Sequence, residues 1–399
     1  MIVKQEWKGF MMNAQELMET LKQGVNTQFQ LSHCIVNGEI LKLEDVESAG
    51  YSRFLNYAIA KLPIKLYKYF PNFVDAKTGK NYSLEALKDN MVYMQSPQNF
   101  DDVYDSEISL DFYTFHKFRL FEYCKRCGLS IGEDQSIETL GNAFTKHIYD
   151  SYNEYHDLEH FFIKDSASEL EKLSNQQFEL KLKIEWSNEK GLTEAISYII
   201  NQEYKEYMDQ LKTTFRVSCF TTSPYSQLMW SSYADCHRGF CVEYTFSKDP
   251  EFDDVEKNLF PVVYCMVRRD LTKYFAESKD KEVTIENLWE LCLNGVLRKS
   301  IDWAYQNEWR LFVPRGYAVN DKLKFFPITK VFLGNRISAE KKREIMDICV
   351  EKNIPYVGVI RNPNLFQMQE CAFDCRTCGS FQERENSLQR KNAEFAKND

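Results

Sequence analysis

The sequence has few residues that break helices, and it has no long apolar run. Its 399 residues include 15 glycines and 10 prolines, so long helices are allowed. No window approaches the roughly 18 consecutive apolar residues of a membrane span. The first residues also lack the apolar stretch of a signal peptide. We therefore expect a cytoplasmic chain with no membrane partner.

An excess of positive charge is lacking too. The chain carries 50 basic and 59 acidic side chains, a formal net charge of −9. Such a chain does not coat nucleic acid through bulk charge, although a local basic patch stays open. There is no Gly-rich phosphate loop, no Gly-x-Ser-x-Gly elbow and no His-Glu-x-x-His pair. Their absence argues against kinases, P-loop enzymes, serine hydrolases and zinc proteases.

Strand patterns occur near both ends of the chain and flank a long helical stretch. Asn37-Gly38 between apolar pairs predicts a two-residue hairpin. Residues 110–213 have apolar spacing near 3.6 and little Gly or Pro, which predicts helices. The expected strands lie at 66–70, 91–95, 215–221, 239–246, 260–267, 308–313, 330–333 and 356–359. Further helices are expected at 44–61, 83–88, 225–236, 283–303 and 338–352.

These elements predict an α+β fold: a mixed, mainly antiparallel sheet system with a large all-helical insertion. Strands from both sides of the insertion must meet in one sheet system. The predicted parts are an N-terminal helix and hairpin segment (1–62), an α+β core (63–109 and 214–360), the helical insertion (110–213) and a Cys-containing C-terminal tail (361–399).

Several short motifs are spread along the chain outside the helical stretch. They are Leu66–Tyr69, Ser96-Pro97 with Phe100-Asp101-Asp102, Cys219–Thr221, Met229-Trp230 with Tyr233-Ala234, His237 with Gly239–Cys241, and Glu308–Arg310. Together they resemble a family of bacterial and phage proteins known only as a domain of unknown function. One position departs from the family pattern, because Val103 stands where the family has Pro, while Asp102 and Asp105 keep its pair of carboxylates.

The order of these motifs is similar to that of ADP-ribosyltransferase-like folds. Those folds place a basic or aromatic residue on an early strand and a Glu on a late strand. The resemblance implies a transferase that uses NAD as substrate, with a protein or nucleic acid as target. The resemblance to the bacterial and phage family implies an effector role in toxin or phage-defence systems.

Cleavage of NAD passes through a positively charged ribosyl centre and needs a nearby carboxylate. Glu308 is the candidate for that carboxylate, with His237 and Tyr233 as further catalytic candidates. Alternation places Glu308 and Arg310 on the same face of their strand. The alternative is an ion pair on a solvated face. For His237 the alternative is a cap on the last carbonyls of a helix.

The predicted cofactor site needs aromatic surfaces for the nicotinamide ring and polar or cationic groups for the rest of the nucleotide. Trp230 and Tyr233 lie three residues apart on a helix, where the alternative is core packing. The residues assigned to this site are Tyr67, Lys68, Tyr69, Ser96, Trp230 and Arg310.

Two clusters suggest metal ions. Cys371, Cys375 and Cys378 have the spacing of a structural zinc site, which Cys124 and Cys127 could complete. The same spacing occurs in iron–sulfur loops, but a C-terminal tail is an unusual place for one. The alternative is free thiols. Residues 101–107 crowd four carboxylates into one loop, either a divalent-cation site or a solvated turn.

The sequence thus leaves two functions open. The first is an NAD-cleaving enzyme, and the second is a non-catalytic module that binds a nucleotide or a partner. A small nucleotide ligand is expected in both, and the oligomeric state is not defined by either. If Glu308 and Arg310 are paired and buried away from any cleft, the second function is favoured.

Overall fold

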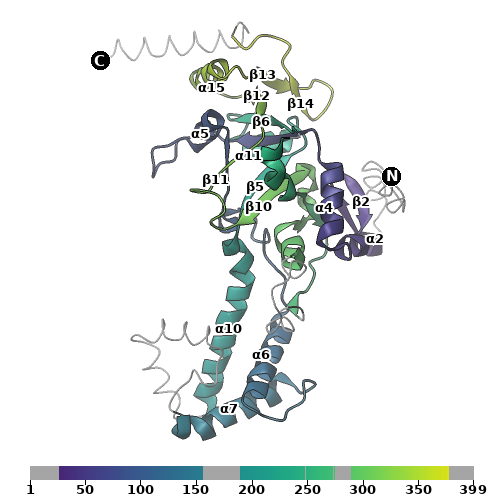
Figure 1. The fold of residues 1–399 in the computed structure, drawn as a ribbon, viewed down its shortest axis with the longest axis vertical. Coiled ribbons are helices and arrows are strands. Elements are labelled where there is room, and N and C mark those ends of the chain that lie inside the picture. The colour runs from purple at the N-terminus through teal and green to yellow at the C-terminus, as the bar shows by residue number, and fades with distance from the viewer. Residues whose placement is uncertain (1–26, 156–188, 248, 273, 275–288, 377–399) are drawn as a thin grey trace. The chain divides into compact units, whose positions relative to one another are not determined.

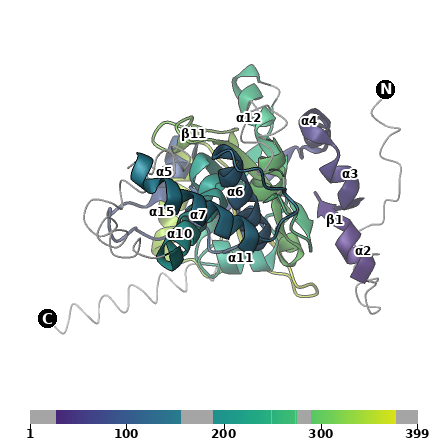
Figure 2. The same cartoon turned by 90° about the horizontal axis from the view of Figure 1, so that it is seen from below.

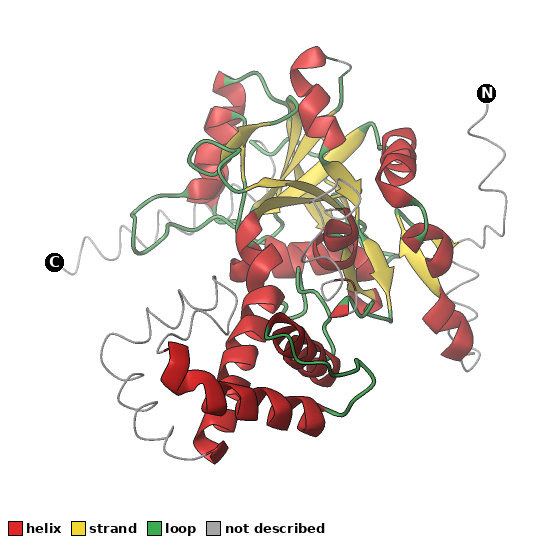
Figure 3. Cartoon of the chain, turned by 60° about the horizontal axis from the view of Figure 1, so that its bottom comes forward, coloured by secondary structure: helices red, strands yellow, loops and turns green. Residues whose placement is uncertain are grey.

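The structure is a computed structural model that describes residues 27–155, 189–247, 249–272, 274 and 289–376 (Figure 1). Within these residues no helix is long and apolar enough to cross a membrane. The chain divides into two compact units. The sheet unit comprises Met1–Asp105, Thr213–Val267 and Leu297–Asp399, and the helical unit comprises Ser106–Lys212 and Arg268–Val296. The strands of the described residues, drawn as yellow arrows in Figure 3, all belong to the sheet unit.

The sheet unit is built on a mixed sheet with the strand order β14-β13-β12-β6-β3-β5-β10-β7. Only the β12–β13 pair of this sheet is parallel. This confirms the predicted α+β fold with mainly antiparallel strands. The strands are β3 (Lys65–Phe70), β5 (Phe215–Thr221), β6 (Phe240–Thr245), β7 (Leu259–Pro261), β10 (Glu308–Pro314), β12 (Ile328–Leu333), β13 (Tyr356–Arg361) and β14 (Met368–Glu370).

A smaller sheet has the order β2-β1-β8-β9, and β11 pairs with β4 alone. The predicted hairpin joins β1 to β2 through Asn37 (φ 51°) and Gly38 (φ 76°), the two left-handed residues that such a turn requires. The strands are β1 (His33–Val36), β2 (Glu39–Lys42), β4 (Met91–Tyr93), β8 (Val263–Cys265), β9 (Arg298–Ser300) and β11 (Lys322–Lys324).

Helices border the sheets of this unit. Near the hairpin, α2, α3 and α4 lie close to β1, as Figure 2 shows from below. The helices are α2 (Thr27–Ser32), α3 (Leu43–Glu47), α4 (Gly50–Lys61), α5 (Tyr82–Asp89), α11 (Gln227–Tyr233), α12 (Asp253–Lys257) and α15 (Ala339–Glu351). Short 3-10 turns are η1 (Pro97–Asn99), η3 (Pro250–Phe252) and η5 (Ile301–Gln306).

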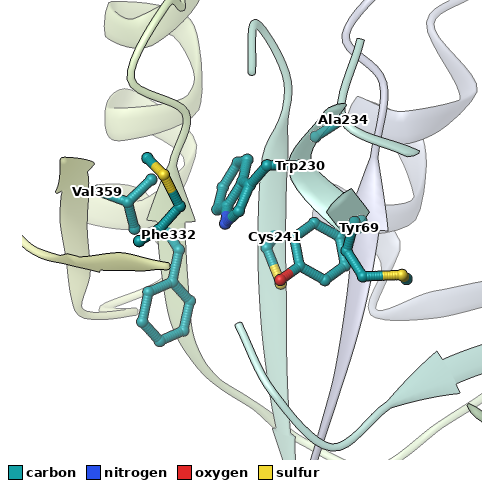
Figure 4. Packing of buried hydrophobic residues seen from close by; sticks show 8 residues of the cluster. Tyr69, Trp230, Ala234, Cys241, Phe332 and Val359 are labelled. Atoms are coloured by element: carbon teal, nitrogen blue, oxygen red, sulfur yellow. The ribbon is translucent and has the colours of Figure 1, made fainter. Parts of the chain in front are cut away.

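The pleat of the large sheet gives its strands two distinct faces. Tyr69 pairs with Cys241, and both side chains pack against α11 in a core cluster with Trp230, Ala234 and Phe332 (Figure 4). Side chains at alternate positions point to the opposite face. That face holds a second aromatic cluster of Phe220, Tyr244 and Phe325.

The helical unit contains α6 (Phe112–Arg126), α7 (Ile137–Tyr155) and most of α10 (Glu189–Thr214). Its core includes an ion pair between Arg119 Nε and Glu203 Oε2 at 2.5 Å. The Tyr123 hydroxyl donates to the other oxygen of Glu203 at 2.5 Å. All three side chains are buried.

Two sequence predictions of secondary structure are wrong. Residues 283–303 were expected to form one helix, but the described part is helical only at 289–296, as an α-helical turn (289–291) followed by the π-helical turn η4 (Cys292–Val296), and then forms β9 and η5. η4 is buried on every side, and for such a segment apolar spacing cannot separate helix from strand. The strand expected at 260–267 is divided between β7 and β8, which belong to different sheets. The break follows Pro261, which has no backbone N–H to continue a ladder.

Candidate functional site

The candidate site starts on β10. Glu308 and Arg310 lie two residues apart, so both side chains project from the same face of the strand. Arg310 is fully buried and Glu308 is 5% exposed. Arg310 Nε donates to Glu308 Oε1 at 2.7 Å. The two residues are therefore paired and buried.

A second carboxylate reaches Arg310 from the loop that follows η1. Asp105 Oδ1 and Oδ2 accept from Arg310 Nη1 and Nη2 at 2.7 and 2.6 Å, a bidentate pair. Phe100 of the same loop lies against the guanidinium, with its ring centroid 5.6 Å from Cζ. Asp105 is only 3% exposed. The solvated turn considered for the acidic loop is therefore wrong for Asp105.

Lys299 on β9 joins the two carboxylates. Its Nζ lies 3.2 Å from Glu308 Oε2 and 3.2 Å from Asp105 Oδ2. We call Asp105, Lys299, Glu308 and Arg310 the four-charge network. Its two positive and two negative charges sum to zero, which limits the cost of burying them.

The network keeps its members ionised at neutral pH. Burial alone raises the pKa of Glu308, but attraction by Arg310 and Lys299 outweighs it and holds that pKa well below its usual range. Burial likewise raises the pKa of Asp105, and attraction by Arg310 reverses the effect. Burial lowers the pKa of Lys299, whereas attraction by Glu308 raises it further than burial lowers it.

A hydrogen-bond chain connects the network to the surface. Lys299 Nζ donates to Gln306 Oε1 at 2.9 Å, and Gln306 Nε2 donates to the Tyr233 hydroxyl at 2.6 Å. Lysine has no acceptor, so the amide oxygen must face Lys299 and the NH₂ group must face Tyr233. The Tyr233 oxygen therefore accepts, and its own proton is left to donate elsewhere.

Tyr233 is 37% exposed, whereas Gln306 is 2% exposed. Partial burial raises the pKa of Tyr233 to about 12, so the phenol keeps its proton at neutral pH. Two other partly exposed aromatic residues come from η5, with Trp303 and Tyr305 ring centroids 6.1 Å apart. Lys299 Nζ lies 5.0 Å from the Trp303 ring centroid. We call Tyr233, Trp303 and Tyr305 the aromatic rim.

Lys68 does not join this site. Tyr67 pairs with Thr221, and Glu308 pairs with Thr221 from the other side, so Tyr67 and Glu308 share a face and Lys68 points to the opposite one. Lys68 Nζ donates to Ser218 Oγ at 3.1 Å and to the Cys219 carbonyl at 3.0 Å. Burial lowers its pKa. The structure therefore separates two residues that the sequence assigned to one pocket.

Trp230 and Tyr69 lie in the core. Trp230 is fully buried, its Nε1 donates to the Pro224 carbonyl at 2.8 Å, and its ring packs edge-on to Tyr69 at 5.1 Å (Figure 4). The Tyr69 hydroxyl donates to the Ser223 carbonyl at 3.0 Å. Core packing was the alternative for Trp230, and its burial leaves no ring face for a ligand.

Tyr67 and Ser96 take part in other interactions. The Tyr67 hydroxyl donates to Glu243 Oε2 at 3.1 Å, and Lys65 Nζ donates to Glu243 Oε1 at 2.9 Å. Ser96 precedes η1, and its carbonyl accepts from Asn99 N at 3.0 Å. Of the six residues assigned to the cofactor site, only Arg310 belongs to the four-charge network.

His237 lies in a left-handed turn after α11. Asp235, Cys236 and His237 have φ angles of 48°, 51° and 68°. The His237 ring stacks on Trp230 at 6.3 Å, and its Nε2 lies 3.2 Å from Ser231 Oγ. Burial lowers the pKa of His237, which favours the neutral ring. The His237 amide donates to the Trp230 carbonyl of α11 at 3.0 Å, so the backbone of His237 caps this helix as the alternative expected. The ring contacts with Trp230 and Ser231 do not involve the four-charge network.

Glycine makes this turn possible at Gly334. A Cβ at Gly334 would lie 2.3 Å from the His237 carbonyl oxygen, closer than side chains tolerate. The Arg336 amide donates to the same oxygen at 2.9 Å. The backbone of His237 is therefore fixed from both sides, which allows its left-handed conformation to persist.

The predicted zinc site is only partly described. Cys371 N donates to the Gly358 carbonyl at 2.8 Å, and a Cβ on Gly358 would lie 3.1 Å from Cys375 Sγ. The third cysteine, Cys378, lies outside the described residues. Among residues that are described, no group of three His, Cys, Asp or Glu side chains could hold a metal ion. Cys124 is buried, and its thiol lies 3.5 Å from the Leu140 carbonyl in the helical unit.

Sequence reasoning missed Lys299 and Gln306. Lys299 fell inside the wrongly predicted helix at 283–303, and nothing local marks Gln306 as polar and buried. The motif pattern partly indicated Asp105 as a site residue, since Asp105 is one of the two carboxylates kept from the family pattern. Its partner Arg310 lies 205 residues away, a contact that local patterns do not specify.

Comparison with known proteins gives one match. Residues 229–311 match a family model described as "Protein of unknown function (DUF2971)". The matched residues run from α11 to β10 and include Tyr233, Lys299, Gln306, Glu308 and Arg310. No curated protein and no solved structure gives a significant match. The resemblance to ADP-ribosyltransferase-like folds stays a prediction.

Proposed function

We propose that the sheet unit is a nucleotide-binding module whose ligand docks on the aromatic rim. The observation that carries this proposal is the Tyr233 hydroxyl. It accepts from the buried Gln306 at 2.6 Å, so it presents its proton as an oriented donor at a side chain that is 37% exposed. Because the hydrogen bond from Gln306 already orients this hydroxyl, the donor loses little conformational freedom when it binds a ligand, which favours affinity.

The rim suits a ligand with a flat ring and hydrogen-bond acceptors. Tyr and Trp side chains stack on bases and on nicotinamide without selecting one ring strongly. Trp303 and Tyr305 are both partly exposed and both come from η5, directly before Gln306. A nucleotide such as NAD offers both the ring and the acceptors.

Binding is favoured over cleavage by the position of Glu308. NAD cleavage would require this carboxylate to contact a ribose, but it is 5% exposed. Its oxygens already accept from Arg310 at 2.7 Å and from Lys299 at 3.2 Å. An NAD-cleaving enzyme would have to open the network before reaction. The effector role implied by the family resemblance is compatible with either activity.

The test is a titration of the full chain with NAD, ADP-ribose and AMP by calorimetry, with nicotinamide release followed in parallel. We expect binding without release, and weaker binding to Tyr233→Phe. Tyr317→Phe is the matched control, because Tyr317 is a 49% exposed tyrosine of the same unit. Release of nicotinamide that Glu308→Gln abolishes would establish the enzyme instead. Absence of binding to all three nucleotides would refute the module.

A further inference from the structure

The two carboxylates of the four-charge network are held very differently. Glu308 belongs to β10, which is paired with β5 and β7, and its amide donates to the Tyr264 hydroxyl at 2.9 Å. Asp105 belongs to a surface turn, in which its amide donates to the Asp102 carbonyl at 3.0 Å. Moving Glu308 would disrupt the sheet, whereas Asp105 lies outside the strands and can move with its loop.

The two residues before Asp105 in this loop are turned to solvent, whereas Ser106 directly after it is fully buried. Val103 and Tyr104 are 71% and 62% exposed, while Asp105 is 3% exposed. The Asp105 carboxylate thus enters the network from an exposed loop, much as the carboxylate of a bound ligand would. Apart from Asp105, the network has two cations and one anion, a net charge of +1 that calls for one negative group.

The geometry of the cations suits an oxyanion. Arg310 directs Nη1 and Nη2 at two oxygens of one group, at 2.7 and 2.6 Å. Lys299 Nζ reaches one of those oxygens at 3.2 Å. The guanidinium fork matches carboxylate and phosphate groups equally well. Glu308 fixes the fork from its other side through Nε.

We propose that Arg310 and Lys299 form a binding site for a singly charged oxyanion, a carboxylate or a phosphodiester, and that Asp105 is its occupant within the chain. An external ligand displaces Asp105 and the loop that carries it. A monoanion replaces a monoanion, so the buried charge stays at zero. Only the identity of the natural ligand rests on the proposed function, in which the phosphodiester would belong to the nucleotide.

The experiment removes the internal occupant and supplies external ones. Asp105→Ala is titrated with formate, acetate and dimethyl phosphate, and thermal unfolding and calorimetry are recorded. Sodium chloride at equal ionic strength is the control for salt. We expect the variant to bind these anions about tenfold or more tightly than the parent, because a tethered carboxylate competes at a high effective concentration. Sulfate, a dianion, should bind more weakly than formate.

Two further variants locate the effect. Asp101→Ala changes an exposed carboxylate of the same loop and should respond to anions as the parent does. Asp105→Ala combined with Lys299→Met should lose most of the gain. If Asp105→Ala does not fold, Asp105→Asn keeps the shape of the side chain and removes its charge, and the same titrations apply.

The proposal is overturned if Asp105→Ala and Asp105→Asn respond to the anions no more than to chloride. A response to formate and acetate without one to dimethyl phosphate supports the site and excludes the nucleotide phosphate as its ligand. No nucleotide enters these titrations, so failure of nucleotide binding at the aromatic rim is detected separately from failure here.

Discussion

Both units of the protein contain a cluster of buried charged side chains. The two clusters differ in the exposure of the residues that their described hydrogen bonds reach. In the helical unit, Arg119, Tyr123 and Glu203 are 2%, 0% and 5% exposed, and the bonds described among them join members of the cluster. In the sheet unit, the four-charge network continues through Gln306 to Tyr233, which is 37% exposed.

The difference shows that burial and pairing do not by themselves identify a functional site. Both clusters would attract attention as buried ion pairs, and structural pairs are common. The network in the sheet unit orients a group, the Tyr233 hydroxyl, that solvent and ligands can reach. The comparison predicts that substitutions in the helical-unit cluster lower the free energy of unfolding alone. Substitutions in the sheet-unit network should lower both the free energy of unfolding and the affinity for nucleotide.

The largest effect is expected from Arg310→Met. It leaves Asp105 and Glu308 buried without their main partner, so the free energy of unfolding should fall by about 3–5 kcal/mol. Urea unfolding of the parent and the variant measures the loss. The control is Arg216→Met on β5, whose partner Asp321 has a 55% exposed side chain and which should cost at most about 1 kcal/mol. Equal losses would contradict a special role for the network.

A smaller effect is expected from Glu203→Gln in the helical unit. The amide can still accept from Tyr123, but Arg119 loses its countercharge, so we expect a loss of about 2–3 kcal/mol. Calorimetric titration with nucleotide should give the parent's affinity at a temperature where the variant is folded. A weakened affinity would contradict the separation between the two clusters.

Acid should weaken the four-charge network. The folded-state pKa values of Glu308 and Asp105 lie below their unfolded values of about 4.3 and 3.9. Their contribution is therefore complete above about pH 5 and is lost as the pH falls through the folded values. Urea unfolding between pH 7 and pH 3 should show this decline. Asp105→Asn should flatten part of it, and an unchanged slope would argue against the depressed pKa of Asp105.

The smallest effect on stability is expected from Tyr233→Phe. The hydroxyl is at the exposed end of the chain of hydrogen bonds, so its removal should cost about 1 kcal/mol or less. Nucleotide affinity should fall about five- to tenfold, because the oriented donor is lost. A variant that loses stability but keeps its affinity would show that the hydroxyl serves the fold only.

Much of the fold followed from local patterns. β5 (Phe215–Thr221) and the hairpin at Asn37-Gly38 lie where the sequence predicts them, since alternation and left-handed turn residues are local properties. The joint orientation of Glu308 and Arg310 followed from the pleat in the same way.

The site depended on longer-range facts. Whether Lys68 faces Glu308 is decided by the pairing of β3 with β5, and a shift of one residue would reverse the answer. Asp105 and Arg310 meet only after the chain has folded. The sequence therefore identified the two members of the network on β10, but not the other two or the link to Tyr233.

The strand order has a consequence for synthesis of the chain. β3 ends at Phe70, yet its main neighbour β6 begins at Phe240. At typical translation rates, roughly 10 to 30 seconds separate the two strands at the ribosome. The other neighbour of β3, β5, begins only at Phe215, so for most of that interval β3 has no partner strand in the large sheet and its apolar residues can pair with wrong segments. The nascent protein should therefore depend on chaperones that hold extended segments, and slow codons before residue 240 should lower its yield.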